Sequence, residues 1–169
     1  INETLECWEI ALKSKNTPSA IALSRQKVPY INPKNSKENK SEKGAYVVNI
    51  TSHESNVTLI ASGTEVELAL KVQESLKKNK IDSKVVSMPC MELFDKQSKD
   101  YQKDILEENS LIITLEAGSI MSWQKYIGNN GMNLGIDKFG ESAPYKEVYH
   151  HLGLSEEKIT SFIQKKLRE

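Results

Sequence analysis

The chain has 169 residues, enough for one ordinary domain or for one domain with a fragment of a second. Its 23 basic and 23 acidic side chains cancel, so the overall charge favours neither nucleic acid nor an anionic membrane as a partner. No apolar run approaches the ~20 residues of a membrane span, and the N-terminus lacks the basic and apolar blocks of a signal peptide. The first residue is not Met, and we expect the chain to be truncated.

The first elements predicted along the chain are a helix and a strand. Leu5, Trp8 and Leu12 recur at spacings of three and four residues, which places them on one face of a helix. The helix is expected to end before Pro18, because proline disfavours helical geometry in the residue before it. The apolar run at residues 20–23 predicts a buried strand.

A polar segment then divides the chain. Residues 29–43 are rich in Lys, Asn, Ser and Glu and have almost nothing to bury, so they predict a linker. One helix and one strand are too little for an independent domain. Residues 1–28 are therefore expected to be the tail of a neighbouring domain, and residues 44–169 a domain of their own.

From residue 44 onward, apolar strands alternate with helices. The predicted strands cover residues 45–50, 56–63, 83–89, 110–116 and 132–137, and the predicted helices cover residues 64–79, 99–108, 122–128, 143–153 and 155–167. This alternation predicts a three-layer α/β/α fold with a mostly parallel sheet of about five strands.

The sequence also predicts how several of these helices begin. Thr64 and Glu67 have the spacing of a capping box, in which each side chain bonds a backbone N–H at the start of the helix. Pro144 is expected near the first position of its helix, and Ser155 is expected to cap the last one.

Candidate functional residues follow the predicted strands, because open parallel sheets bind ligands beyond the carboxyl ends of their strands. Glu116 and Asp137 could form an acid–base pair there, with Ser119 as a third polar group. The commoner role of such residues is to cap turns and helices, and the sequence leaves both readings open. The turn around Thr64 lacks the glycine spacing of a dinucleotide site and the lysine of a phosphate loop.

The cysteines and histidines predict no metal site. Cys7 and Cys90 are far apart, and neither has a second ligand at metal-binding spacing. Their number allows one disulfide, although two free thiols in a cytosolic protein are the more ordinary expectation. His150 and His151 are adjacent on a predicted helix, where they point about 100° apart and make poor co-ligands.

Arg25 follows the apolar run at residues 20–23. A guanidinium fixed at a strand end suits bidentate recognition of a phosphate. An ion pair or a solvated side chain is the alternative, and spacing does not decide between them.

Six strings carry a resemblance to a known family: "TPSAIALSRQKVP", "KGAYVV", "LIASGTEVELAL", "KVVSMPCMELFDKQ", "LEAGS" and "GIDKFGESAPYKEVYHHLGL". In this order and spacing they resemble the C-terminal third of the transketolases, over nearly the whole chain. The similarity is nearer to this family than to the deoxyxylulose-phosphate synthases or the pyruvate dehydrogenase beta subunits.

The resemblance implies both an architecture and an activity. Residues 1–28 would be the end of the pyrimidine-binding domain, residues 29–43 a linker, and residues 44–169 the C-terminal domain. Members of the family are cytoplasmic homodimers of the pentose phosphate pathway. They transfer a two-carbon ketol unit between phosphosugars, using thiamine diphosphate and a divalent metal (Mg or Ca). Arg25 matches the arginine that binds the phosphate of the sugar substrate.

The resemblance also implies what this chain lacks. The family's diphosphate- and metal-binding motif, its cofactor-activating glutamate and its catalytic histidines match no residue here, so no catalytic, cofactor-binding or metal-binding residue is assigned. The isolated chain is expected to be inactive and to bind no thiamine diphosphate. The alternative is a stand-alone ligand-binding, regulatory or dimer-supporting module that uses the sheet edge around Thr64, Glu116, Ser119 and Asp137.

Overall fold

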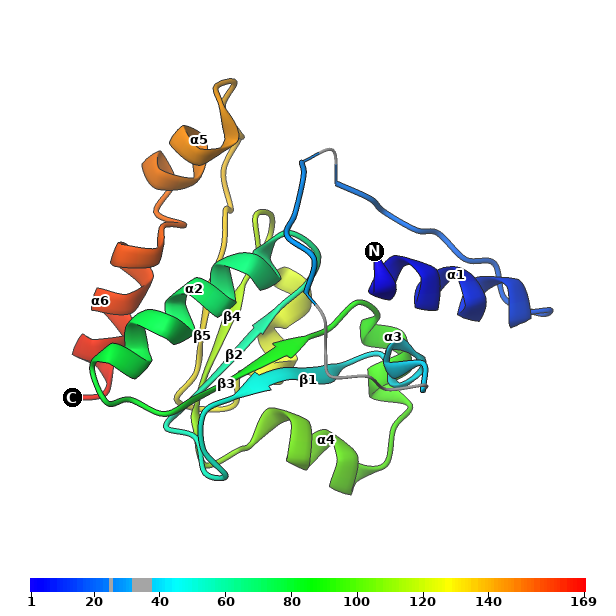
Figure 1. Cartoon of the computed structure of the whole chain (residues 1–169), viewed down its shortest axis with the longest axis horizontal. Coiled ribbons are helices and arrows are strands. Elements are labelled where there is room, and N and C mark those ends of the chain that lie inside the picture. The colour runs from blue at the N-terminus through cyan, green and yellow to red at the C-terminus, as the bar shows by residue number, and fades with distance from the viewer. Residues whose placement is uncertain (25, 32–37) are drawn as a thin grey trace.

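Five strands form one sheet in the order β1-β3-β2-β4-β5 in the computed structural model, which describes residues 1–24, 26–31 and 38–169 (Figure 1). The strands are β1 Tyr46–Ile50, β2 Val57–Ala61, β3 Ser83–Ser87, β4 Leu111–Leu115 and β5 Met132–Leu134. Strands β2 to β5 pair in parallel, and β1 pairs antiparallel with β3 at one edge. The predicted fold class, a mostly parallel sheet of five strands, is confirmed.

Helices cover both faces of the sheet. The α-helices are α1 Asn2–Lys13, α2 Glu65–Lys78, α3 Met91–Asp95, α4 Lys99–Leu106, α5 Tyr145–His151 and α6 Glu156–Lys166, and the 3-10 helices are η1 Lys40–Lys43 and η2 Met121–Tyr126. Helices α2 and α6 pack on one face, while α3, α4 and η2 pack on the other. The sequence did not predict α3. None of the helices in the described ranges is long and apolar enough to cross a membrane.

Strand β2 lies at the centre of the core. All five of its residues are fully buried, and its side chains alternate between the two faces of the sheet. Val57, Leu59 and Ala61 pack against α2 and α6, whereas Ile60 packs in the cluster formed by α3, α4 and η2. A strand that is buried on both faces needs a nearly continuous apolar sequence, which explains why β2 could be predicted from the sequence.

The predicted buried strand at residues 20–23 is wrong. These residues form no strand, and the side chain of Leu23 is 64% exposed. A strand needs a neighbouring backbone to pair with, and every ladder of the sheet in the described residues is formed by β1 to β5.

The segment predicted as a linker is folded at its C-terminal end. The side chain of Asn39 caps η1 by accepting a hydrogen bond from the backbone N–H of Glu42, and Ser41 is fully buried. Residues 32–37 of the predicted linker lie outside the described residues. The end of this segment therefore has its own hydrogen bonds and is more than a spacer.

Helix α1 contacts the rest of the chain through its carboxylates. Glu3 accepts hydrogen bonds from the hydroxyls of Tyr46 on β1 (2.9 Å) and Ser87 on β3. Glu6 accepts from both the backbone N–H and the hydroxyl of Ser41, at 3.0 and 2.8 Å. These contacts hold α1 beside η1 and the edge of the sheet.

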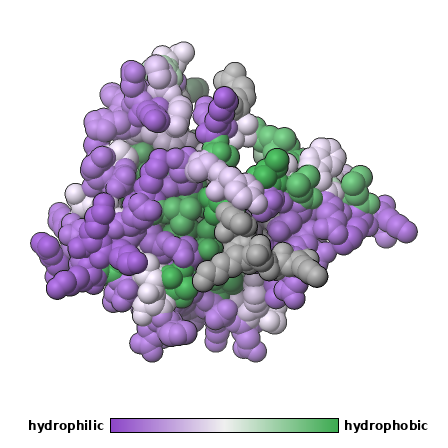
Figure 2. All heavy atoms as spheres, viewed as in Figure 1, coloured by the Kyte–Doolittle hydropathy of each residue, from purple (hydrophilic) through white to green (hydrophobic). Residues whose placement is uncertain are grey.

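The apolar face of α1 points away from the sheet. Leu5, Trp8 and Leu12 are 62%, 50% and 78% exposed. Figure 2 shows hydrophobic surface at this end of the molecule, where α1 and the extended segment after it lie. The helix predicted from these three residues is therefore confirmed, but they contribute nothing to the core of this chain.

The predicted starts of two helices have different outcomes. Ser155 caps α6, because its hydroxyl accepts a hydrogen bond from the backbone N–H of Lys158. The capping box of Thr64 and Glu67 is wrong, since Thr64 makes no side-chain cap and donates instead to Glu65 (2.6 Å). Thr64 has helical φ and ψ angles of −64° and −29°, whereas a capping side chain needs extended backbone.

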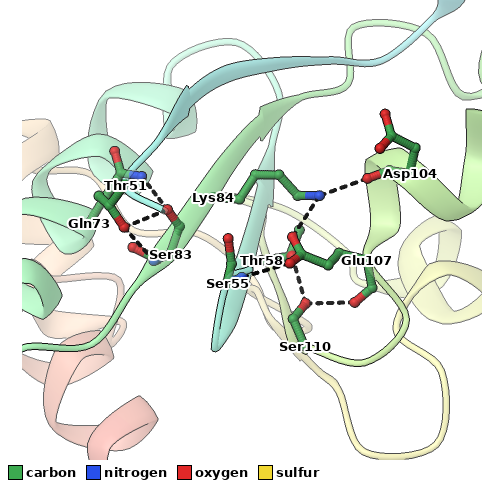
Figure 3. Close-up of polar contacts among 9 residues, drawn as sticks. All are labelled: Thr51, Ser55, Thr58, Gln73, Ser83, Lys84, Asp104, Glu107 and Ser110. Carbon is green, nitrogen blue, oxygen red and sulfur yellow. Dashed lines mark hydrogen bonds and ion pairs between the residues drawn. The ribbon is translucent and has the colours of Figure 1, made fainter. Parts of the chain in front are cut away.

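A buried ion pair lies at the amino end of the parallel strands (Figure 3). The Lys84 side chain on β3 is 5% exposed, and its Nζ lies 2.8 Å from Glu107 Oε2. The same ammonium donates to the backbone carbonyl of Asp104 at 2.7 Å, and Glu107 Oε1 accepts from the backbone N–H of Ser55 at 2.7 Å. The pair therefore joins the start of β3 to the end of α4 and to the loop before β2.

Replacing Lys84 with methionine should strongly destabilise the fold, because it leaves the Glu107 carboxylate without its cation. We expect the free energy of unfolding to fall by about 3–5 kcal/mol, measured by urea denaturation. Lys78→Met is the matched control, because Lys78 is exposed on α2 and the change should cost less than about 0.5 kcal/mol. Equal losses in the two variants would contradict this role for the ion pair.

Candidate functional site

The carboxyl ends of β2, β3 and β4 lie side by side, at the end of the sheet that we call the carboxyl edge, and surround a pocket of about 250 Å³. Ser62 follows β2, Met88 follows β3 and Glu116 follows β4, and all three line the pocket. Residues far apart in the sequence converge here because parallel strands end on the same side. This is the edge at which the sequence predicted a site.

Glu116 is the central carboxylate of this edge. Its Oε2 accepts a hydrogen bond from the indole Nε1 of Trp123 on η2, at 3.1 Å. Burial raises the pKa of the Glu116 carboxyl above its ordinary value of 4.5, and the negative charge of Glu65 raises it further, while the bond from Trp123 opposes the shift. Trp123 itself is 1% exposed, so the donor that bonds this carboxylate is buried.

Glu65 is a second carboxylate that the sequence did not single out. It is the first residue of α2 and is 5% exposed. It accepts hydrogen bonds from the hydroxyls of Thr64 and of Tyr149 on α5. Burial, together with the hydrogen bond to Glu65, raises the pKa of the Tyr149 phenol, so the phenol stays a donor. The sequence gives no signal for this contact, because Tyr149 is 84 residues away.

Asp137 and Ser119 cap the local backbone. Asp137 Oδ1 accepts from the backbone N–H of Ile120 at 3.2 Å, and Ser119 Oγ accepts from the N–H of Met121 at 3.4 Å. Asp137 is exposed and makes no hydrogen bond with Glu116 within the described residues. The geometry therefore favours the capping reading of Asp137 over an acid–base pair.

The histidines and cysteines form no metal site in the described part of the chain. His151 Nε2 lies 3.2 Å from Glu141, and the backbone carbonyl of His150 accepts from the side chain of Lys158. Cys7 and Cys90 are both free and half-buried, and burial is the main cause that raises the pKa of each thiol. They are consequently poor nucleophiles at neutral pH.

Arg25, the predicted phosphate ligand, lies outside the described residues. Its neighbours Leu23 and Val28 are 64% and 47% exposed. The structure therefore leaves the role of Arg25 as a prediction.

Comparison with known proteins identifies the family. The model of the transketolase-like C-terminal domain matches residues 44–155, more than half of the chain. The chain belongs to the transketolase family. This confirms the resemblance carried by the six sequence strings.

Individual relatives are similar to this chain over almost its whole length. A transketolase from Rhodobacter capsulatus is 39% identical over 168 residues, covering 96% of this chain and 25% of the relative. A chloroplastic transketolase from Solanum tuberosum is 38% identical over 163 residues, covering 95% of this chain and 22% of the relative. The crystal structure of a Pichia stipitis transketolase in complex with sedoheptulose 7-phosphate superposes with a TM-score of 0.89 at 29% identity, covering 99% of this chain and 24% of that one. The chain thus spans about a quarter of the length of these relatives.

The raised pKa of Glu116 predicts a pH-dependent stability. The folded state binds this proton more tightly than the unfolded state, so the ionised carboxylate costs stability once the pH rises above 4.5 and through the folded pKa. Glu116→Gln keeps an acceptor for Trp123 and removes the charge. We expect the variant to be more stable than the parent at pH 7, and the difference to vanish as the pH falls below 4.5.

Urea unfolding across this pH range measures the effect. Glu54→Gln is the matched control, because Glu54 is exposed in the loop between β1 and β2. A Glu116→Gln variant that is less stable than the parent at pH 7 would show that the charged carboxylate is favoured at this position.

Proposed function

We propose that this chain is the C-terminal part of a transketolase, which transfers a two-carbon ketol unit between phosphosugars. The observation that carries the proposal is similarity to complete transketolases over 91–98% of the chain, in bacterial and plant relatives alike. The Pichia stipitis relative was solved with sedoheptulose 7-phosphate, which supports phosphosugars as the substrate class. Cytoplasmic homodimers of the pentose phosphate pathway are the setting that the family implies.

The cofactor and metal sites of the reaction belong, in this proposal, to other parts of the complete enzyme. Thiamine diphosphate supplies the carbanion chemistry when it is bound, with Mg or Ca holding its diphosphate. The residues of this chain do not fit that role. The sequence has no diphosphate motif, and the described residues contain no cluster of three His, Cys, Asp or Glu that could hold an ion. No catalytic step is therefore assigned to this chain.

Arg25 is the residue proposed to contact the substrate. Its guanidinium can hold a sugar phosphate through two parallel hydrogen bonds, which fixes the orientation as well as the affinity. Such a contact positions the sugar for the reaction and takes no part in bond making.

The division into domains is also part of the proposal. We take residues 1–28 as the end of the pyrimidine-binding domain, residues 29–43 as a linker, and residues 44–169 as the C-terminal domain. The family model begins at residue 44, which supports the last boundary. The exposed apolar face of α1, with Leu5, Trp8 and Leu12, supports the first, because such a face is normally covered by a neighbouring domain.

In the complete enzyme, Arg25→Ala should raise KM for phosphosugar donors by about 10- to 100-fold, because it removes a charge-assisted contact of about 1.5–3 kcal/mol. Steady-state kinetics with a phosphorylated and an unphosphorylated ketose measures this, and the unphosphorylated donor should be almost unaffected. Arg168→Ala, which changes the other arginine of the chain, is the control. Unchanged KM for both donors would remove Arg25 from the substrate site.

The purified 169-residue chain should bind no thiamine diphosphate and have no ketol-transfer activity. Isothermal titration with cofactor and Mg, followed by a coupled activity assay, tests both statements. Sequencing the coding region upstream of Ile1 gives an independent test, because the proposal requires several hundred further residues that carry the diphosphate motif. A reading frame that starts at Ile1 would contradict the proposal.

A further inference from the structure

The pocket at the carboxyl edge lies where the connections of the sheet diverge. From β2 the chain passes through α2 to β3 over one face, and from β3 it returns through α3 and α4 to β4 over the other face. Strands β3 and β4 flank β2 on opposite sides, so the loops after β2 and β4 separate and leave a crevice. Such switch points are the usual ligand sites of open parallel sheets.

The residues that line this pocket are polar, acidic or apolar, and none is basic in the described part of the chain. Its hydroxyl, thiol and carboxylate groups come from Ser62, Ser119, Ser122, Cys90, Glu92 and Glu116. Its apolar lining residues are Met88, Pro89, Met91 and Trp123. Met88 and Trp123 are almost fully buried, so the accessible apolar surface comes from Pro89 and Met91. Within the described part of the chain, no Lys, Arg or His lines it. The pocket therefore offers negative charge and apolar surface together.

Glu116 has one oxygen that is available to a ligand. Trp123 occupies Oε2, and no donor among the described residues reaches Oε1. Gly118 lies beside Oε1, and a Cβ added there would come within 3.4 Å of this oxygen. Glu116 is also not among the fully buried polar side chains without a partner in the described residues, so Oε1 keeps access to solvent. The groups facing Glu116 are the indole of Trp123 on η2, Glu65 at the start of α2 and the phenol of Tyr149 on α5. None of these is a cation.

We propose that this pocket binds a small organic cation, with a primary ammonium against Glu116 and a short apolar body against Pro89 and Met91. A volume of about 250 Å³ suits a ligand of a few carbon atoms. The ammonium compensates a half-buried carboxylate that lacks a positive partner within the described residues, which is the electrostatic condition for a charge-assisted hydrogen bond. The site differs in charge preference from the phosphate-binding role proposed for Arg25.

An anionic ligand is disfavoured here by Glu116 and Glu92, because like charges without intervening cations repel in a partly desolvated pocket. A neutral alcohol could bond the serine hydroxyls but would leave the carboxylate uncompensated. Cationic, anionic and neutral ligands of the same shape should therefore bind with different affinities.

The test is a titration of the ¹⁵N-labelled 169-residue chain with butylammonium chloride, read at the indole Nε1–H resonance of Trp123. The indole of Trp8, half-exposed on α1, is an internal control in the same spectrum. We expect a saturable shift of the Trp123 resonance alone. Butanol and butyrate, which have the same chain length, should bind at least about tenfold more weakly.

Two variants locate the charge that selects the ligand. Glu116→Gln should weaken butylammonium binding by about tenfold or more. The glutamine can still accept the hydrogen bond from Trp123, so the variant should keep the spectrum of a folded chain. Glu54→Gln, at the opposite edge of the sheet, should bind as the parent does. The proposal would be overturned if butanol bound as tightly as butylammonium, or if butyrate or inorganic phosphate bound. It would also be overturned if sodium chloride at the same concentration shifted the Trp123 resonance as butylammonium chloride does, or if the Trp123 resonance did not shift.

Discussion

The complete burial of β2 is the constraint on which the rest of the structure depends. This strand is paired in parallel on both sides and covered on both faces, so its backbone and side chains have no access to water. Its one polar side chain, Thr58, can be accommodated because its hydroxyl bonds that of Ser110 at 2.7 Å. Helices α2 and α4 are then obliged to cross opposite faces to reach the flanking strands. As a result, polar side chains that converge from several strands can do so only at the two ends of the sheet.

The two ends use polar groups in different ways. At the amino end, Lys84 and Glu107 neutralise each other and bond the surrounding backbone, so the network is closed and serves to join elements (Figure 3). At the carboxyl end, Glu65 is satisfied by two hydroxyls, while Glu116 has one donor and a raised pKa. A closed network stabilises a fold, whereas an uncompensated group beside a pocket costs stability and is available for binding. Ligand binding by the polar groups of the sheet is therefore expected at the carboxyl end.

The sequence predicted the strands and most helices because their apolar periodicity arises within each element. All five predicted strands of the sheet are found, as are the helices α1, α2, α4, α5 and α6. The short helix α3 was missed, because five residues are too few to show a helical period. Glu65 was missed because its partner Tyr149 is 84 residues away in the sequence. The carboxyl edge was predicted as a region, but the partners of Glu116 and Asp137 depend on how η2 and its flanking loops fold.

The structure of residues 1–31 was predicted less well than that of the rest of the chain, and helix α1 shows why. Its amphipathic pattern predicted a helix correctly, yet its carboxylates contact the sheet edge while its apolar face is exposed. Periodicity reports that a segment has a face to bury and does not report what covers it. The apolar run at residues 20–23 forms no strand here, and under the proposed domain arrangement the surface that would cover it lies in another domain. Arg25 belongs to this segment. Its proposed role therefore depends on contacts outside the C-terminal domain, whereas the polar groups around Glu116 are arranged entirely within it.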